Sequence, residues 1–265
     1  MLIDVIDQIA VSTKELPLLD RGELFGDGFF TTGIIKQHQL CYQQQHIERL
    51  KKSAKILQFA KIDFSLLENK LKAVCTKVAN ATIRISFSRR QKQRGYAIAE
   101  EGEFHCRIIL SELASPPKQS CELVEANTAV SYNPSLAGIK HNNRLDSVLA
   151  ATEITNQYQE ALMFHNDTVI CGSKSNLFVK LNNKWVTPDL TFCGIHGITR
   201  NRVLKAFANN NIEHEIRTIN RAELNHVSSA FMTNSLIGVW PVSKINQRQL
   251  DLIYCNEIKH LIQRT

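Results

Sequence analysis

The chain has 265 residues, of which 43% are hydrophobic and 22% are charged. This balance is typical of a globular protein and excludes a disordered or fibrous chain. No stretch approaches the roughly 18 to 20 consecutive apolar residues that a membrane-spanning helix needs. The N-terminal stretch MLIDVIDQIAVSTKELPL has acidic residues within its first apolar run and matches neither a signal peptide nor a transit peptide, so we expect a cytoplasmic location.

The formal net charge of +7 admits anionic partners. The densest basic run, SRRQKQRGY at residues 88–96, lacks interleaved aromatic residues and matches no DNA-binding motif. We therefore expect a solvated or substrate-facing loop there and no nucleic-acid partner. The seven cysteines are scattered and never form a C-x-x-C pair, which predicts reduced thiols and argues against both a disulfide framework and a metal site.

The first part of the chain mixes strand and helix patterns. Short runs rich in β-branched and aromatic residues predict strands, and apolar residues at three- and four-residue steps predict one helix. The expected strands are 28–36, 39–43, 81–89, 104–113 and 121–132, and the expected helix is 46–57.

Two prolines and a serine interrupt these patterns at residues 113–120, which makes this stretch the best linker candidate. The second part resumes with expected helices at 147–160 and 197–211 and expected strands at 160–165, 168–172, 176–181 and 184–188. We therefore expect an α/β (α+β) protein with a domain over 1–112, a linker over 113–120 and a larger domain over 121–265. A cleft between two such domains is the usual place for a ligand.

Two segments have the features of anion sites. Gly194 and Gly197 precede Ile198, Thr199 and a long helical pattern, and the free N–H groups at a helix start attract a phosphate. The stretch Thr233–Ser235 places three hydrogen-bonding side chains after an apolar strand. Each also has a plain structural explanation, a helix cap in the first case and a turn capped by its own side chains in the second.

Two further features lie elsewhere in the chain. A tight turn at Gly26–Gly28 launches a strand in which Phe30 and Thr32 share one face. Lys140 sits between a short apolar run that contains Gly138 and the start of a predicted helix. Taken alone, this lysine is either a solvated loop charge or a functional amine.

Together, these motifs resemble one known family. The segments RGELFGDGFFTT, HIERL, RISFSR, RGY, NPSLAGIKHNNRLDSVL, SNLFVKLNNKWVTPDLTFCGIHGITR and NSLIGVWPV occur in this order and span most of the chain. The set is similar to the fold type IV pyridoxal-phosphate enzymes, and within them it looks more like the lyases that act on 4-amino-4-deoxychorismate than like the aminotransferases. The resemblance implies a small N-terminal α/β domain, a larger C-terminal pseudo-barrel domain, pyridoxal 5'-phosphate in the cleft between them, and a homodimer.

The resemblance also assigns roles to individual residues. It makes Lys140 the lysine that bonds to the cofactor and then serves as acid and base, with Thr32 delivering a proton and Phe30 forming an apolar wall. For the two carboxylates of the substrate, our candidates are Arg94 and Arg144. The positions implied for the cofactor phosphate are Arg49, Ile198, Thr199, Asn234 and Ser235.

The chain departs from this family at Cys171. The family usually carries a glutamate seven positions ahead of the phenylalanine of its NLF motif, where the carboxylate pairs with the pyridine nitrogen of the cofactor; counting back from Phe178 leads to Cys171. A thiol makes at best a weak neutral hydrogen bond, and a thiolate would be the other substitute for the carboxylate.

The expected reaction is the conversion of 4-amino-4-deoxychorismate to 4-aminobenzoate and pyruvate, which supplies folate synthesis. Two alternatives stay open: an aminotransferase acting on branched-chain or D-amino acids, and a cofactor-binding protein whose activity has decayed. The cysteine weighs more against the aminotransferase, because amino transfer depends more heavily on the electron-accepting power of the cofactor.

Overall fold

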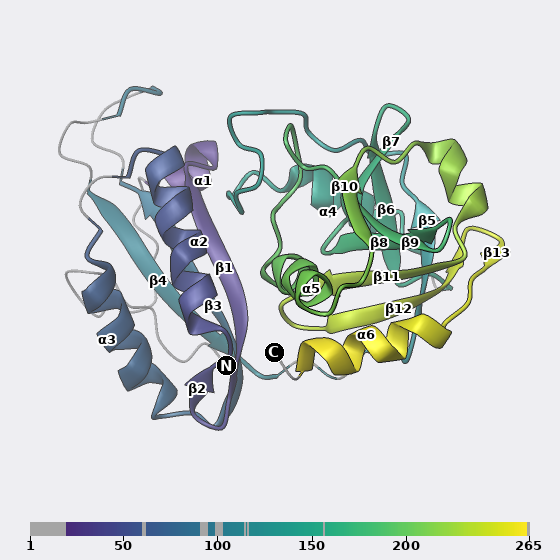
Figure 1. Cartoon of the computed structure of the whole chain (residues 1–265). Helices are drawn as coiled ribbons and strands as arrows, with labels where there is room; N and C mark the ends of the chain where they lie inside the picture. The colour runs from purple at the N-terminus through teal and green to yellow at the C-terminus, as the bar shows by residue number, and fades with distance from the viewer. Residues whose placement is uncertain are drawn as a thin grey trace. The chain divides into compact units, whose positions relative to one another are not determined.

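In the computed structural model, residues 20–59, 62–90, 95–98, 103–113, 115, 117–155 and 157–263 are described (Figure 1). By its internal contacts the chain divides into two compact units, which we describe one at a time. Unit 1 comprises Met1–Ser115 and Ile139–Asn143, and unit 2 comprises Pro116–Gly138 and Arg144–Thr265. The segment that carries Lys140 therefore groups with unit 1, although it follows the expected linker in the sequence.

Unit 1 is an antiparallel sheet of four strands in the order β2-β1-β3-β4 (Figure 1). Its strands are β1 (Gly28–Lys36), β2 (Gln39–Leu40), β3 (Asn80–Arg89) and β4 (Phe104–Ser111). Its helices are α1 (Arg21–Phe25), α2 (Gln43–Ile56) and α3 (Phe64–Cys75).

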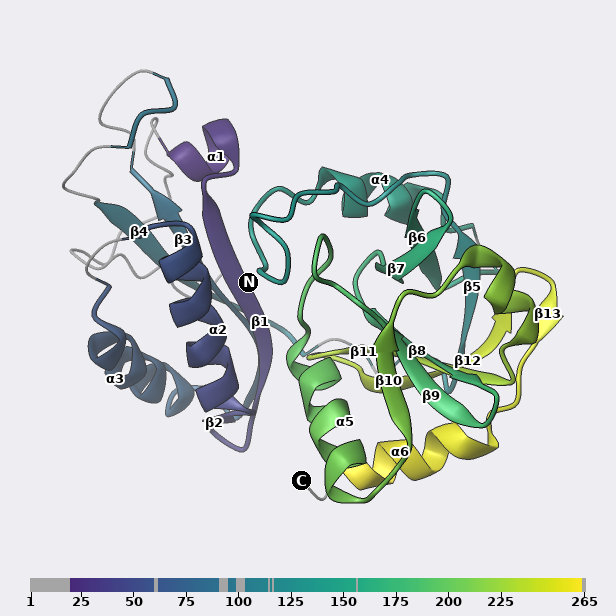
Figure 2. The same ribbon diagram turned by 45° about the horizontal axis from the view of Figure 1, so that its top comes forward.

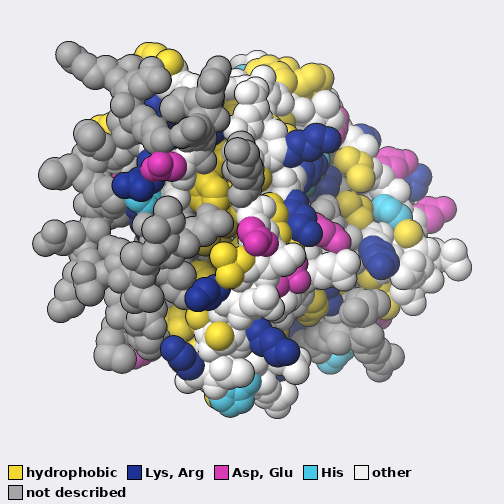
Figure 3. All heavy atoms as spheres, turned by 90° about the vertical axis from the view of Figure 1, so that its left-hand side faces the viewer, with side chains coloured by type: hydrophobic (Ala, Val, Ile, Leu, Met, Phe, Trp, Pro, Cys, Tyr) yellow, Lys and Arg dark blue, Asp and Glu magenta, His cyan; other side chains and the backbone are white. Residues whose placement is uncertain are grey.

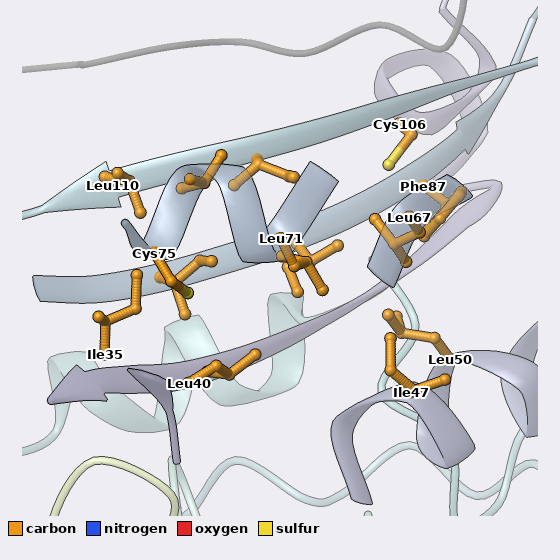
Figure 4. Close-up of a cluster of buried hydrophobic side chains, with 14 of the residues drawn as sticks. Ile35, Leu40, Ile47, Leu50, Leu67, Leu71, Cys75, Phe87, Cys106 and Leu110 are labelled. Atoms are coloured by element: carbon orange, nitrogen blue, oxygen red, sulfur yellow. The ribbon is translucent and has the colours of Figure 1, made fainter. Parts of the chain in front are cut away.

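The two faces of this sheet differ because side chains alternate along each strand. On β3, Ile83, Ile85 and Phe87 point into a buried apolar cluster shared with α2 and α3, whose side chains appear in Figure 4. The residues between them face the other way and are partly buried; they include Arg84. Since Thr32 of β1 lies opposite Arg84, it shares this second, more polar face.

Helix α2 is fixed at its C-terminal end by an arginine from β3. Ile47, Leu50 and Ala54 recur at three- and four-residue steps and are buried in the cluster. Just past the helix, Arg89 donates hydrogen bonds to the carbonyl oxygens of Leu57 at 2.6 Å and Gln58 at 3.2 Å. These bonds satisfy carbonyl groups that a helix end leaves without partners.

A buried histidine joins the start of α2 to β1. His46 lies 2.6 Å from the Thr31 hydroxyl through its Nδ1 atom, and both residues are almost fully buried. A Cβ at Gly33 would lie 2.7 Å from Nε2 of the same ring, so only glycine leaves room for it. Burial lowers the pKa of His46 to about 3, with a smaller contribution from the positive charge of Arg49. The imidazole is therefore neutral at neutral pH.

Unit 2 is built on a sheet of nine strands in the order β10-β9-β8-β11-β12-β5-β6-β7, with β13 paired to β12 (Figure 2). The sheet curls, because its terminal strand β7 also contacts β8 and β9. The strands are β5 (Cys121–Glu125), β6 (Glu160–His165), β7 (Thr168–Gly172), β8 (Asn176–Leu181), β9 (Lys184–Pro188), β10 (His214–Arg217), β11 (Ser229–Asn234), β12 (Gly238–Ile245) and β13 (Arg248–Gln249).

Helices and apolar clusters cover both faces of the curled sheet. The helices are α4 (Leu145–Thr152), α5 (Ile198–Asn209), α6 (Ile253–Gln263) and the 3-10 helix η1 (Arg221–His226). On β8, Leu177 and Val179 belong to a cluster on one face, while Phe178 packs on the other face with side chains of α5 and α6. The start of α5 lies beside Asn176 at the start of β8, where the site described below lies.

Most of the predicted strands are confirmed. The strands at 28–36, 81–89, 104–113 and the four short ones between 160 and 188 occur within two residues of the expected bounds, and so do the helices at 46–57 and 197–211, apart from an earlier start of the first. Both units are thus mixed α/β structures, as the patterns indicated. Helices α1, α3 and α6, the 3-10 helix η1 and strands β10, β12 and β13 were not predicted.

Three of the predicted bounds are wrong. The strand expected over 39–43 ends at Leu40, because Tyr42 adopts a φ of 57° and starts α2. The strand expected over 121–132 ends at Glu125, and the helix expected over 147–160 is α4, which ends at Thr152. One residue explains both: the carboxylate of Glu153 turns back to accept hydrogen bonds from the chain at Asn127 and Thr128.

Part of the basic run at 88–96 is engaged within unit 1. Arg89 forms a 3.0 Å ion pair with Asp27, and Arg90 forms a 3.1 Å pair with Glu103. On the face seen in Figure 3, Lys and Arg side chains lie scattered among Asp, Glu and uncharged side chains. Within the part of the chain that the structure describes, no helix is long and apolar enough to cross a bilayer.

The neutral, buried state of His46 makes unit 1 sensitive to acid. In the unfolded chain this imidazole binds a proton below a pKa of about 6.5, whereas in the folded protein its pKa is about 3. The unfolded state therefore binds more protons between these values, so stability is complete above pH 6.5 and falls as the pH drops. Compared with His46→Gln, wild type should lose about 1.4 kcal/mol more unfolding free energy per pH unit below 6.5 in urea titrations. Parallel curves for the two proteins would contradict this.

Candidate functional site

The position of Lys140 is set by backbone pairing with β1. The Phe30 N–H donates to the Lys140 carbonyl oxygen at 2.9 Å, and the Asn142 N–H donates to the Gly28 carbonyl oxygen at 2.9 Å. Phe29 and His141 form an antiparallel bridge between them. The segment around Lys140 thus extends the sheet of unit 1, and the lysine is a fixed part of the fold rather than a loose loop charge.

The amine of Lys140 lies over an aromatic ring. Its Nζ atom is 4.8 Å from the ring centroid of Phe30, within the range of a cation–π contact. Phe30 is only 6% exposed. The next residue on the same strand face is Thr32, which is partly buried. Unit 1 therefore brings together three of the residues that the sequence nominated: Lys140, Phe30 and Thr32.

Arg84 completes this group, and the sequence analysis did not nominate it. Its guanidinium carbon lies 3.6 Å from the Phe30 ring centroid, and its backbone is paired with Thr32 across β1 and β3. Burial lowers the pKa of Arg84, yet a guanidinium stays protonated at neutral pH. Within the described residues, the structure records no hydrogen bond and no ion pair for this side chain. A partly buried guanidinium without a protein acceptor is suited to a carboxylate or phosphate ligand.

In unit 2, the start of α5 is open to an anion. Its N-cap residue is Gly197, and no side chain caps the helix. A Cβ at Gly197 would lie 2.1 Å from Oδ1 of Asn176, so any larger residue would displace that side chain. The next two residues, Ile198 and Thr199, are buried. Free N–H groups at a helix start, together with the helix dipole, form a binding site for a phosphate.

A buried hydroxyl adds to this site. Thr233 is 1% exposed, and its Oγ1 atom has no hydrogen-bond partner among the described residues. Thr233 pairs with Asn176 across β11 and β8, so the two side chains share a face of the sheet, and Asn176 in turn donates to the Ile195 carbonyl oxygen at 2.9 Å. An orphaned donor beside an uncapped helix start fits a phosphate group.

The other residues expected near the phosphate lie as follows. The Oδ1 atom of Asn234 accepts hydrogen bonds from the backbone of Leu236 and Ile237, which is the capped turn considered as an alternative above. Ser235 lies in that turn. Arg49 lies on α2 in unit 1, where burial lowers its pKa to about 10, so it is charged at neutral pH. That Arg49 and the start of α5 bind the same phosphate stays a prediction.

Cys171 is a neutral thiol. Burial raises the pKa of Cys171 to about 12, and the negative charge of Glu160 adds to the shift, while the positive charge of Arg144 opposes it. At neutral pH the thiolate is therefore absent, and of the two substitutes for a carboxylate considered above only the weak neutral hydrogen bond remains. Arg144 is the N-cap residue of α4 in unit 2. Arg94 lies outside the described residues.

Unit 1 thus presents an amine and a guanidinium on one sheet face, and unit 2, taken by itself, presents an uncapped helix start. Residues 28–245 match the amino-transferase class IV family. Over 240 residues, the chain is 31% identical to an aminodeoxychorismate lyase of Vibrio harveyi, covering 87% of this chain and 88% of the relative. It is 26% identical to a D-alanine aminotransferase of Bacillus licheniformis, covering 86% of this chain and 82% of the relative.

The fold agrees with the sequence comparison. The crystal structure of 4-amino-4-deoxychorismate lyase from Pseudomonas aeruginosa superposes with a TM-score of 0.91 at 28% identity, covering 96% of each chain. The two curled sheets define a mixed α/β protein of fold type IV. The chain belongs to the class IV aminotransferase family, whose members depend on pyridoxal 5'-phosphate. The expected family and fold class are confirmed.

Proposed function

We propose that this protein is a pyridoxal-phosphate-dependent lyase that converts 4-amino-4-deoxychorismate to 4-aminobenzoate and pyruvate. The observation that carries the proposal is the group on one sheet face of unit 1, where Lys140 and Arg84 flank the Phe30 ring beside Thr32. The substrate has an amine and two carboxylates, and this group offers an amine, a guanidinium and a hydroxyl. The likeness to the lyases of Vibrio harveyi and Pseudomonas aeruginosa supports the same activity.

The residues that would hold the cofactor come from both units. Lys140 would bind it covalently, and the uncapped start of α5 at Ile198 and Thr199, together with the orphaned hydroxyl of Thr233, would hold its phosphate. Arg49, Asn234 and Ser235 complete the proposed phosphate site, with Asn234 acting through the turn that its side chain caps. When bound, the cofactor supplies a conjugated ring that accepts electron density from the substrate carbon bearing the amine.

The protein's own residues would move the protons. Lys140 Nζ takes the proton from the ring carbon that bears the amine, and Phe30 forms an apolar wall beside the lysine. The Thr32 hydroxyl delivers a proton to the methylene carbon of the enolpyruvyl group as the ring carbon–oxygen bond breaks, and the proton that Lys140 took from the ring replaces it on Thr32. One proton leaves the ring and one reaches the methylene, so the products together have the composition of the substrate, and the new aromatic ring drives the reaction.

Arg84 is the residue we assign to a substrate carboxylate in unit 1. It is held against Phe30 at 3.6 Å and has no acceptor among the described residues, so its donors are available to a planar anion. Arg144, the N-cap residue of α4 in unit 2, is the candidate for the second carboxylate. Arg94 stays a sequence-based candidate.

The neutral thiol of Cys171 favours elimination over amino transfer. With its pKa raised to about 12 by burial, Cys171 carries no negative charge that would keep the pyridine nitrogen protonated. Amino transfer depends on that protonated ring more than an elimination that ends in an aromatic product. Aminotransferase activity, for which the Bacillus licheniformis relative is named, is therefore the second candidate.

We also propose that the protein acts as a homodimer. Helix α4 exposes Leu145, Val148 and Leu149, of which Leu145 is 75% exposed. The exposed rings of Tyr132 and Phe192 stack on each other at 5.8 Å in the same unit. We call these five residues the α4 patch. Exposed apolar patches of this kind mark protein–protein contacts, and a second copy of the chain is the partner that the family resemblance implies.

A cytoplasmic location and a role in folate synthesis complete the proposal. All seven cysteines are free thiols, which agrees with a reducing compartment. The product 4-aminobenzoate is a building block of folate, so the proposed reaction would supply that pathway.

The first test is a product assay on the purified protein. Wild type should show a visible absorption band that borohydride removes, and should release 4-aminobenzoate and pyruvate in equal amounts from 4-amino-4-deoxychorismate. Lys140→Ala should show neither the band nor the products, because it lacks the amine that bonds to the cofactor. A parallel assay follows amino transfer from D-alanine and from branched-chain amino acids to 2-oxo acids. A bound cofactor with amino transfer and no 4-aminobenzoate would replace the lyase with the aminotransferase.

Arg84→Met should weaken substrate binding without loss of the cofactor. Removing a charged hydrogen bond to a carboxylate should raise KM for 4-amino-4-deoxychorismate about 10- to 100-fold, with a smaller change in kcat and an unchanged visible band. Arg90→Met removes the same charge from an exposed ion pair of the same strand region and serves as the control. An unchanged KM in Arg84→Met would rule out the assigned role.

The α4 patch should govern the oligomeric state. In sedimentation velocity at micromolar concentration, wild type should have twice the chain mass of 30.1 kDa. The double variant Leu145→Asp/Val148→Asp should sediment as a monomer, because two charges cannot be buried in an apolar contact. Ile253→Asp changes another exposed apolar residue, on α6, and should stay dimeric. A dimer in all three proteins would place the interface elsewhere.

A further inference from the structure

Glu160 is a buried carboxylate for which the proposed mechanism has no use. It is the first residue of β6 and is 0% exposed. Four groups donate hydrogen bonds to it: the backbone N–H of Ala161 at 3.0 Å, the backbone N–H and hydroxyl of Ser173, and the hydroxyl of Ser175 at 2.6 Å. The structure records no ion pair for Glu160 within the described residues. Burying a charged group costs free energy. A carboxylate held here by nearby backbone N–H groups and serine hydroxyls therefore has a specific structural role.

The donors show that this task is to shape the turn after β7. Ser173 and Ser175 lie in the turn, and the Gly172 N–H donates to the Ser175 carbonyl oxygen at 2.8 Å, which closes it. The fit is tight, because a Cβ at Gly172 would lie 2.6 Å from the Ser175 hydroxyl and 2.9 Å from the carboxyl carbon of Glu160. Glu160 therefore binds both serines at once and sets the conformation of the turn.

The turn delivers Asn176 to the start of α5. Asn176 directly follows Ser175 and is itself buried. Its Nδ2 atom donates to the Ile195 carbonyl oxygen at 2.9 Å, and its Oδ1 atom occupies the space where a Cβ of Gly197 would be. The position of Asn176 thus fixes the loop that leads into the uncapped helix start.

The same loop holds the chain just before Lys140. The Gly138 N–H donates to the Gly194 carbonyl oxygen at 2.9 Å, and the His196 N–H donates to the Gly138 carbonyl oxygen at 3.1 Å. Gly138 has a φ of 80°, and a Cβ there would lie 3.0 Å from the His196 ring. A continuous set of contacts therefore runs from Glu160 through the turn and the 194–197 loop to the residue two positions before the lysine.

We infer that Glu160 is a positioning residue, which holds the phosphate-binding start of α5 and the segment that leads to Lys140 through the turn at 172–175. The inference rests on the proposed cofactor site. Glu160 contacts neither of these elements directly; it acts through Ser175 and Asn176. Loss of its carboxylate should therefore weaken the hold on the cofactor more than it weakens the fold.

The chain offers a matched control in Glu153. This carboxylate also accepts four hydrogen bonds within unit 2, from the backbone and side chain of Asn127 at 2.6 and 3.1 Å and from the backbone and hydroxyl of Thr128 at 2.9 and 2.6 Å. Its partners lie in the loop after β5, and none of these bonds reaches the α5 start. Glu153→Gln therefore alters a carboxylate with the same number of hydrogen bonds, at a less buried position and with no bond to the proposed cofactor site.

The experiment measures cofactor affinity beside fold stability. Wild type, Glu160→Gln, Ser175→Ala and Glu153→Gln are stripped of cofactor; the apparent Kd for pyridoxal 5'-phosphate and the Tm of the stripped proteins are then determined. The side-chain NH2 of glutamine cannot accept a hydroxyl bond, so Glu160→Gln should raise Kd about tenfold or more, and Ser175→Ala should raise it severalfold. Glu153→Gln should leave Kd unchanged even where its Tm falls. The pH midpoint of the visible band should also shift in Glu160→Gln, because that band reports the environment of the Lys140 amine.

The outcomes separate this inference from the proposed function. If wild type takes up no pyridoxal 5'-phosphate, the proposed cofactor site fails and this inference fails with it. If wild type binds the cofactor, and Glu160→Gln and Ser175→Ala bind it equally tightly, only the role of Glu160 is overturned. An equal rise of Kd in Glu153→Gln would also overturn it, because the effect would then be one of general stability. If Glu160→Gln does not fold, Ser175→Ala decides the question.

Discussion

The pairing of the Lys140 segment with β1 is the constraint on which the candidate site depends. The hydrogen bond from the Phe30 N–H to the Lys140 carbonyl oxygen, 2.9 Å long, fixes the lysine to the same strand that presents Phe30 and Thr32. The flanking residues of this segment belong to unit 2. Backbone bonds to β1 therefore fix the lysine within unit 1, and Gly138, two residues earlier in the chain, is held by its own bonds within unit 2.

Strand alternation in the sequence was enough to predict part of this site. The two-residue repeat of β1 placed Phe30 and Thr32 on one face, and the structure has them there. The same alternation predicts which residues of the RISFSR run share a face with Arg84. Whether that face is the one that carries Phe30 follows only from the register of β3 with β1, which no local pattern encodes. Hydrogen bonds between residues that are separated in the sequence, such as those from Ser173 and Ser175 to Glu160, cannot be predicted for the same reason.

The helices show a similar limit. The apolar spacing of α2 predicted its existence, yet its C-terminal end depends on Arg89, which lies on β3 and donates to the carbonyl oxygens of Leu57 and Gln58. Likewise, the end of α4 and the end of β5 are both set by Glu153, through bonds to Asn127 and Thr128. Local sequence patterns were therefore enough to predict that these helices and strands exist. Where they end depends on side chains from other parts of the fold.

Burial shifts the pKa of a thiol and that of a guanidinium in opposite directions, and this difference has a chemical consequence. It raises the pKa of Cys171 to about 12, which keeps the thiol neutral, whereas Arg84 stays charged in spite of a lowered pKa because a guanidinium starts so high. The negative charge of Glu160 also acts on Cys171. This carboxylate accepts hydrogen bonds from four donors and holds the turn after β7. In the proposed site, charged guanidinium groups would bind anions, and the neutral thiol would give the pyridine nitrogen only a weak partner. This combination is better suited to an elimination driven by aromatisation than to amino transfer.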